Sequence, residues 1–331
     1  MNIFLAILAL VGGFVLLIKG ADWFVEGSSS VAKLLKVPTI IIGLTVVALG
    51  TSLPEASVSI SSALKGANSL AVSNVVGSNI FNTLVVLGAS ALMVPVNVQP
   101  NSVKKEIPFS ILCTFALLGS LILGADTAVA AEGGAEITTY TLTRIGGLVL
   151  VAFFAFYMYW QISSALKARK AGELEEEEEV KTMKPLISLI AIVGGVACII
   201  LGGNFVVDGA SAIAAKFGMS ETLIGMTIVA IGTSLPELVT SMVAAKKGES
   251  DLALGNVIGS NIFNVVFILG SSALISPITV GLLAVIDTVA VIVITVLVLI
   301  FAAATKNRIS RAEGAVLLAC YAGYFVYMFL R

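Results

Sequence analysis

The sequence predicts an all-α integral membrane protein with ten transmembrane helices, arranged as two inverted five-helix repeats. Composition, apolar run lengths and an internal repeat support this prediction. Of the 331 residues, 58% are hydrophobic and only 12% are charged, and the mean hydropathy is +1.07. Soluble domains carry about 25% charged residues, so this composition is that of a chain embedded in the lipid bilayer. The net charge of −1 offers no basic surface, and no nucleic-acid partner is expected.

Apolar runs of about 20 residues mark the candidate transmembrane spans. The ten runs lie near residues 3–25, 38–64, 69–93, 106–125, 142–165, 186–208, 221–245, 251–275, 280–304 and 311–330. The first run is also long enough for a signal peptide. It lacks a basic segment before it and a small-residue cleavage site after it, so we expect a retained helix.

The internal repeat relates the two halves of the chain. Residues 43–96 align with residues 225–278 without a gap, and 30 of the 54 aligned positions are identical. The match continues weakly upstream, where "GADWFVEG" at 20–27 aligns with "GGNFVVDG" at 202–209. Shared hydrophobicity alone would not give this identity, so the halves are homologous units of five spans each.

An odd number of spans in each repeat makes the two repeats cross the membrane in opposite directions. The first repeat covers residues 1–165 and the second covers 186–331. With the N-terminus outside, 14 Lys and Arg residues fall on the inner side and 4 on the outer side, as the positive-inside rule requires. We therefore expect a multi-pass protein of the cell membrane with both termini outside. Residues 166–185, with their glutamate run, are expected to be a solvated cytoplasmic linker.

A proline and an acid interrupt the second and seventh spans, within "GTSLPE" at 50–55 and again at 232–237. Pro54 has no N–H, so the carbonyl of Gly50 loses its helical partner, and the second copy of the motif repeats this break. Freed carbonyls are costly in lipid but tolerable where they line a wet cavity or hold a cation. Broken helices within inverted repeats are typical of secondary transporters, with the binding site at the membrane midplane.

Polar residues gather on one helical face in each of four spans. Around the prolines these positions are Ala48, Thr51, Ser52 and Glu55, and Ala230, Thr233, Ser234 and Glu237. In the following spans they are Asn74, Ser78 and Asn82, and Asn256, Ser260 and Asn264. Spacings of three and four residues place each set on one side of its helix. We expect the four faces to converge around one axis.

Two acids buried at this depth need a compensating charge. A charged side chain at the centre of a membrane helix costs about 2.5–3.5 kcal/mol, and two carboxylates in one cavity also repel each other. A divalent cation would remove both penalties. The surrounding hydroxyl, amide and carbonyl oxygens are hard ligands, which favour Ca²⁺ over a transition metal or Mg²⁺. The same oxygens suit Na⁺, and a site that holds either ion but not both is the site of an exchanger.

Other functional classes fit less well. The chain contains no histidine, and no serine–lysine pair lies at depth, so a membrane enzyme is not expected. An ion channel is disfavoured by the inverted repeat and the single central site. No cofactor is expected.

These motifs carry a resemblance to a known family. "GTSLPE" and "GSNIFN", each present twice in inverted five-helix halves, resemble the sodium/calcium exchanger branch of the cation/calcium exchanger superfamily. The small size and short linker resemble a prokaryotic member. The resemblance covers essentially the whole chain. It implies an ion cluster at the membrane centre and alternating access by sliding of the first and sixth helices past the rest.

The resemblance also implies a role for each motif position. It implies that Glu55 and Glu237 bind Ca²⁺ with help from the carbonyls of Thr51 and Thr233. It implies that Na⁺ is bound by the carbonyls of Ala48 and Ala230 and the hydroxyls of Ser52, Ser234, Ser78 and Ser260, with Asn82 and Asn264 as central amides. In the potassium-dependent branch an aspartate stands where this chain has Asn264, so the resemblance implies K⁺-independent transport. The alternative within the superfamily is Ca²⁺/H⁺ antiport.

Several other polar residues have simpler interpretations. Asn79 and Asn261 lie one position off the polar faces, and we expect them to pack helices together. Asp22, Glu26 and Asp208 lie near the predicted span ends and are expected to be solvated at the interface; a cation funnel is the functional alternative. Asp287 is likewise expected at the interface.

Overall fold

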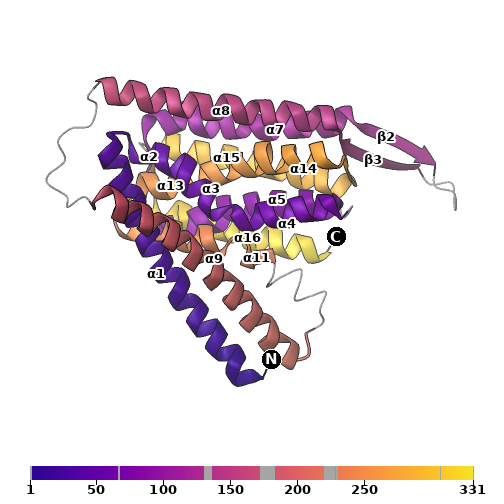
Figure 1. The fold of residues 1–331 in the computed structure, drawn as a ribbon. Coiled ribbons are helices and arrows are strands. Elements are labelled where there is room, and N and C mark those ends of the chain that lie inside the picture. The colour runs from indigo at the N-terminus through magenta and orange to yellow at the C-terminus, as the bar shows by residue number, and fades with distance from the viewer. Residues whose placement is uncertain are drawn as a thin grey trace.

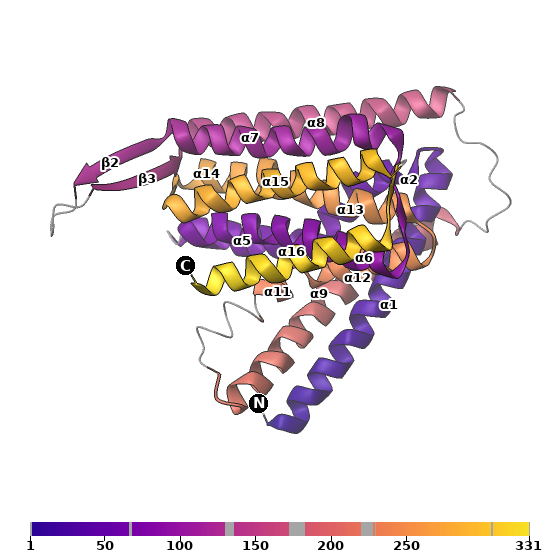
Figure 2. The same cartoon turned by 180° about the vertical axis from the view of Figure 1, so that it is seen from behind.

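The computed structural model is an almost entirely helical protein in which most helices run side by side through one bundle (Figure 1). Helices α1 and α9 cross this bundle obliquely, and the view from behind shows the same arrangement (Figure 2). The structure describes residues 2–65, 68–129, 136–171, 183–219, 228, 230–305 and 307–330.

The first half of the chain supplies eight α-helices and three π-helical segments, labelled η. These are α1 (Ile3–Leu35), α2 (Thr39–Ile42), η1 (Gly43–Val47), α3 (Ala48–Thr51), α4 (Leu53–Leu64), α5 (Asn68–Phe81), η2 (Asn82–Val86), α6 (Leu87–Met93), η3 (Ser102–Glu106), α7 (Ile107–Leu123) and α8 (Arg144–Ala171). The described part of the second half supplies α9 (Pro185–Lys216), α11 (Ala230–Gly232), α12 (Leu235–Lys246), α13 (Ser250–Phe263), η5 (Asn264–Leu269), α14 (Gly270–Ile275), α15 (Leu282–Ala304) and α16 (Arg311–Leu330).

The helical membrane fold predicted from the sequence is confirmed. Within the described residues, seven helices are long and apolar enough to cross a membrane, or eight if the bent pair Thr39–Thr51 and Leu53–Leu64 counts as one span. Part of the predicted seventh span (221–227 and 229) and most of the linker (172–182) lie outside the described residues. The count of ten spans stays a prediction.

Helices α1 and α9 are much longer than the predicted spans, at 33 and 32 residues. At 1.5 Å per residue each is about 50 Å long, which exceeds a hydrocarbon core of about 30 Å. Their oblique course accommodates part of this excess length. Hydropathy underestimated both helices because charged residues such as Asp22 and Asp208 interrupt the apolar runs before the helices end.

Glycines let α1 and α9 approach closely along their length. A Cβ on Gly13 would lie 2.7 Å from the carbonyl oxygen of Gly202, and one on Gly20 would lie 2.9 Å from that of Gly195. As the residue numbers of these contacts rise along α1 they fall along α9, so the two helices run antiparallel. They occupy corresponding places in the two repeats. Small residues at such contacts allow the close backbone packing that joins helices in a membrane.

Two apolar clusters hold the helices together. The larger cluster fills the bundle around α5, α7, α13 and α15. The smaller one joins α1 and α9 to the inner face of α12, with Leu17 and Phe24 fully buried from α1 and Ile199 from α9. The smaller cluster therefore also packs the oblique pair against the main bundle.

Short strands that the sequence analysis did not predict pair the loops of the two halves. Strand β1 (Val96–Asn97) pairs antiparallel with β5 (Arg308–Ile309). A second sheet has the order β2 (Ala125–Val129), β3 (Glu136–Leu142) and β4 (Ile278–Val280). The reason is local: backbone N–H and C=O groups at the helix ends need partners, and a strand pair supplies them.

Asp287 differs from its predicted position. It was expected at the solvated interface, but it is buried in α15 with a relative exposure of 9%. Asp287 is the sixth residue of α15, and the adjacent Thr288 is fully buried, so this part of the helix faces the interior of the protein.

Candidate cation-binding site

The proline breaks fall where the sequence predicts them. Helix α3 ends at Thr51, Ser52 lies outside both helices with φ −81° and ψ 8°, and α4 then starts in a direction bent by 51°. The second half repeats the break at Ser234, with φ −94° and ψ 6°. Each proline occupies the first turn of the new helix, where its missing N–H costs nothing.

The break places both acids in the first turn of a helix. Glu55 lies in the first turn of α4 and Glu237 in the first turn of α12. Both side chains are completely buried, at 0% exposure. The positive end of the helix dipole partly compensates a carboxylate at this position. A continuous helix would have placed the same acids mid-helix, without this stabilisation.

Reciprocal hydrogen bonds join the two acids across the halves of the chain. The Ser52 hydroxyl donates to Glu237 Oε1 at 3.0 Å, and the Ser234 hydroxyl donates to Glu55 Oε1, also at 3.0 Å. Each serine is three residues before the acid of its own half and contacts the acid of the other half. The two carboxylates therefore belong to one fully buried polar cluster.

The neighbouring helices α5 and α13 contribute a second pair of hydroxyls. Ser78 donates to Glu55 Oε1 at 3.3 Å, and Ser260 donates to Glu237 Oε1 at 3.5 Å. Ser234 also lies 3.1 Å from the Ser78 hydroxyl. Hydrogen bonds from both halves thus converge on one oxygen of each carboxylate.

Thr51 and Ala48 lie at the edge of this cluster. The Thr51 hydroxyl donates to Asn256 Oδ1 at 2.9 Å and lies 3.4 Å from the Ser260 hydroxyl. Ser260 also donates to the carbonyl oxygen of Ala48 at 3.4 Å. In the second half, Ala230 begins α11 and the half-buried Thr233 lies in the turn before α12.

The second oxygen of each carboxylate is left without a hydrogen bond. Within the residues that the structure describes, Oε2 of Glu55 and Oε2 of Glu237 are buried and have no donor. Among the described residues, no three His, Cys, Asp or Glu side chains are grouped closely enough to hold a metal ion together. The negative charge at the site therefore comes from two carboxylates surrounded by neutral oxygens. An arrangement of this kind is suited to hard cations of low charge.

The two predicted central amides occupy equivalent positions with different hydrogen bonds. Asn82 opens the π-helical segment η2 and Asn264 opens η5, a helical irregularity that is frequent at functional sites. Among the described residues, neither amide is hydrogen-bonded directly to a glutamate. Asn264 Nδ2 donates to Asn79 Oδ1 at 3.1 Å, whereas Asn82 has no partner in the described part of the chain.

Asn79 and Asn261 pack α5 against α13, as expected from the sequence. Asn79 Nδ2 donates to the Asn261 carbonyl at 3.1 Å, and Asn261 Nδ2 donates to the Thr83 hydroxyl at 2.8 Å. Asn79 has a further role that the sequence analysis missed, since its contact with Asn264 Nδ2 fixes which way that amide points.

Two more asparagines support the backbone of the acids. Asn74 Nδ2 lies 3.3 Å from the Glu55 carbonyl oxygen, and Asn256 Nδ2 lies 3.4 Å from that of Glu237. Both residues were assigned to the polar faces from the sequence, but they were not included among the site residues. Their identical pattern in both halves would have been the signal for this positioning role.

Comparisons with known proteins agree with this geometry. The family model described as sodium/calcium exchanger protein matches residues 5–163 and 187–330. The chain is 40% identical over 320 residues to the putative antiporter CaxA of Alkalimonas amylolytica, covering 96% of each protein. It is 35% identical to the sodium/calcium exchanger MaX1 of Methanosarcina acetivorans, covering 97% of this chain and 98% of that protein.

A solved structure is similar over the full length. The sodium-calcium exchanger NCX_Mj, in a crystal soaked with zero Na⁺ and Ca²⁺, superimposes with a TM-score of 0.81 at 30% identity, covering 99% of this chain and 100% of that one. The family model and both relatives match nearly the whole chain, including both copies of the acid motif. The chain therefore belongs to the sodium/calcium exchanger family.

Proposed function

We propose that this protein exchanges Ca²⁺ for Na⁺ across the cell membrane by alternating access and independently of K⁺. As a member of its family it is a cation/Ca²⁺ antiporter and not an enzyme. The choice of Na⁺ and the role of each residue are the proposal. The observation that carries it is the reciprocal pair of bonds from Ser52 to Glu237 and from Ser234 to Glu55.

In this proposal Glu55 and Glu237 bind Ca²⁺ together. Two carboxylates neutralise one Ca²⁺ completely, and each offers an oxygen that no hydrogen bond occupies within the described residues. The serine hydroxyls can rotate from donors into oxygen ligands when a cation arrives. The carbonyls of Thr51 and Thr233 would complete the calcium ligands.

Sodium ions would use an overlapping set of oxygens. We assign them the carbonyls of Ala48 and Ala230, the hydroxyls of Ser52, Ser78, Ser234 and Ser260, and the amides of Asn82 and Asn264. Contacts between Ser260 and the Ala48 carbonyl, and between Ser260 and Glu237, support this overlap because one hydroxyl serves both sets. Shared ligands make the two ions compete, which is what couples their transport.

The charge of the empty site supplies the second condition for coupling. Two uncompensated carboxylates in a medium of low dielectric constant repel each other strongly and are costly to close off from water. A bound Ca²⁺, or Na⁺ ions in sufficient number, removes this cost. Passage between the two access states is therefore expected only with ions bound.

The antiparallel α1–α9 pair supports alternating access between two related states. Its close glycine contacts suit a pair of helices that moves as one body against the bundle. In inverted repeats the two halves can exchange their conformations, and this exchange moves the opening from one side of the site to the other. We accordingly propose that α1 and α9 slide together past the remaining helices.

The test is Ca²⁺ uptake into proteoliposomes that contain the purified protein. We expect uptake when the vesicles are loaded with Na⁺ and diluted into Na⁺-free buffer, at a rate that added K⁺ does not change. A proton gradient of equal size is expected to drive little uptake. Uptake driven by protons and indifferent to Na⁺ would instead establish the Ca²⁺/H⁺ alternative, which two buried carboxylates could also support.

A further inference from the structure

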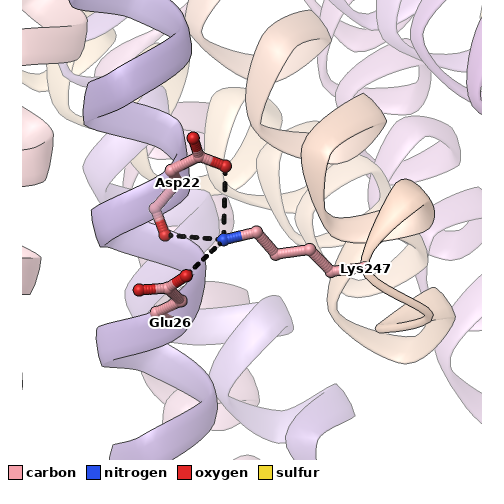
Figure 3. Close-up of polar contacts among 3 residues, drawn as sticks. All are labelled: Asp22, Glu26 and Lys247. Carbon is pink, nitrogen blue, oxygen red and sulfur yellow. Dashed lines mark hydrogen bonds and ion pairs between the residues drawn. The ribbon is translucent and has the colours of Figure 1, made fainter.

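A lysine at the end of α12 is bound by two acids of α1. The Lys247 ammonium lies 2.8 Å from Glu26 Oε1 and 3.2 Å from Asp22 Oδ1, and it donates to the Asp22 carbonyl at 3.3 Å (Figure 3). The three side chains are partly exposed, at 28% for Lys247, 31% for Asp22 and 49% for Glu26. None of them touches the candidate ion site.

Local structure explains why Lys247 reaches α1. Helix α12 ends at Lys246, Lys247 is its C-cap, and Gly248 then adopts the left-handed conformation with φ +82°. Glycine tolerates that conformation, so the chain turns sharply and the lysine projects from the corner. Asp22 and Glu26 are four residues apart and share the face of α1 that meets this corner.

The contact ties the oblique pair to the bundle. Helix α12 carries Glu237 in its first turn and Lys247 at its last, so it is fixed at one end to the candidate ion site and at the other to α1. Movement of α1 along its axis would break all three contacts of the ammonium. The ion pairs therefore favour the position of α1 that the structure contains.

The internal repeat gives this contact a counterpart. Lys247 aligns with Lys65, which is likewise the C-cap of its helix, α4. Glu26 aligns with Asp208 of α9, while Asp22 aligns with the neutral Asn204. Both Lys65 and Asp208 are exposed, and among the described residues they form no ion pair with each other. The contact is made in one half and not in the other.

We propose that Lys247, Asp22 and Glu26 form a latch that holds the α1–α9 pair in the observed position, and that Lys65 and Asp208 form the matching latch in the other position. This proposal rests on the alternating access proposed above. If the repeats exchange conformations, a contact made by two residues in one state is made by their aligned counterparts in the other. The first latch has two carboxylates and the second has one, so the protein is biased towards the observed position.

The test measures the position of α1 directly. Spin labels are placed at Leu35, at the end of α1, and at Arg308 in β5, in the full chain with its three cysteines replaced. The protein is reconstituted in liposomes with the same Na⁺ and Ca²⁺ concentrations on both sides, because bound ions are expected to permit passage between the two positions. The ratio of the populations at the two label distances then reports how much of the protein is in each position of α1. An exposed ion pair shifts such a ratio by up to about fivefold, and Lys247 makes two of them. We expect Lys247→Gln to lower the share of the wild-type distance and Lys247→Arg to retain it.

The neighbouring Lys246 is the matched control, because it is exposed at the same corner and has no ion-pair partner among the described residues. Lys246→Gln should leave the distance ratio unchanged. Adding Lys65→Gln to Lys247→Gln should return the ratio towards the wild-type value. The latch is refuted if Lys247→Gln and Lys246→Gln give the same ratio, and the counterpart is refuted if Lys65→Gln does not reverse the shift.

These outcomes are separate from those of the function test. The label distances are measured without any ion gradient, so they do not depend on which ion drives transport. Absence of Na⁺-driven uptake by the wild-type protein would overturn the proposed function and would leave the distance result intact.

Discussion

Glu55 and Glu237 are tolerable at full burial because several weak effects act on each of them. A helix N-terminus, a serine from the opposite half and a serine from the neighbouring helix all point at each carboxylate. All three are dipoles rather than charges, and among the described residues no lysine or arginine forms an ion pair with either acid. The acids are therefore held in place while a net negative charge remains for a cation.

The first prediction concerns these two acids. Glu55→Gln or Glu237→Gln keeps the shape of the side chain but removes half of the site's charge. We expect Na⁺-driven Ca²⁺ uptake to fall to the level of protein-free liposomes. Ca²⁺ affinity should fall at least about tenfold, because a contact to a charged group is worth about 1.5–3 kcal/mol. Glu249→Gln, in the loop after α12, is the control; near-normal uptake by either site variant would remove that acid from the mechanism.

The second prediction concerns Asn79, which contacts Asn264. Asn79→Ala leaves Asn264 Nδ2 without its acceptor and frees the amide to turn. We expect a loss of about 1–3 kcal/mol in stability and a weaker Na⁺ dependence of Ca²⁺ uptake. Asn261→Ala keeps the carbonyl that accepts from Asn79 and removes the bond from Asn261 Nδ2 to Thr83. The bond between Asn79 and Asn264 stays in place, so this variant should lower stability alone. Equal Na⁺ dependence in the two variants, measured by Na⁺ titration of uptake, would argue against the role of Asn79.

The sequence predicts which residues the two halves share at the site better than it predicts how their hydrogen bonds differ. Repetition of "GTSLPE" predicts that both halves supply the same groups, and the reciprocal serine–glutamate bonds have this symmetry. The two central amides do not, because Thr83, which accepts from Asn261, aligns with Val265 in the second half. Asn261 is therefore bound to Thr83, whereas Asn79 has no threonine at the aligned position 265 and instead accepts from Asn264. A one-dimensional repeat does not reveal which pairs meet across α5 and α13.

At the scale of elements, features caused by the covalent structure of one residue were predicted, and features caused by tertiary contacts were not. The breaks before α4 and α12 follow from proline chemistry and were predicted at the two "GTSLPE" motifs. The π-helical segments at Asn82 and Asn264 were not, since π-helix formation has no comparable signal in the sequence. The strands also escaped prediction, because each is only two to seven residues long and all except β2 pair with a distant loop.

The third prediction concerns the contact between α1 and α9. A Cβ on Gly195 would lie 2.8 Å from both the Gly20 carbonyl oxygen and the Phe24 nitrogen, whereas one on Gly194 would have nothing within 4 Å. Gly195→Ala should therefore force the helices apart and cost about 1–3 kcal/mol, while Gly194→Ala should be neutral or stabilising. Thermal unfolding of the two purified variants checks this difference. Equal melting temperatures would show that the helices are not closely packed here.

At the scale of the whole molecule, the strand pairs link loops on which the orientation depends. Strands β1 and β5 join two loops that the sequence places on the inner side, and β3 and β4 join two that it places outside. Loops that pair must lie on the same side of the membrane. The pairing therefore agrees with the inner and outer loops deduced from charge, although charge and strand pairing are independent observations.

The last prediction concerns this orientation. An odd number of spans makes the two repeats inverted, and the positive-inside rule places the N-terminus outside. Asp126 in β2 and Lys104 in η3 are both exposed, and they lie at opposite ends of α7. In a chain with its three cysteines replaced, Asp126→Cys should react in intact cells with a thiol reagent that does not cross membranes. Lys104→Cys should react only after the cells are permeabilised, because the positive-inside rule retains its loop in the cytoplasm. The reverse pattern would invert the whole molecule, with both termini inside. Reaction of both cysteines from one side would contradict α7 as a complete span and, with it, the five-span repeat.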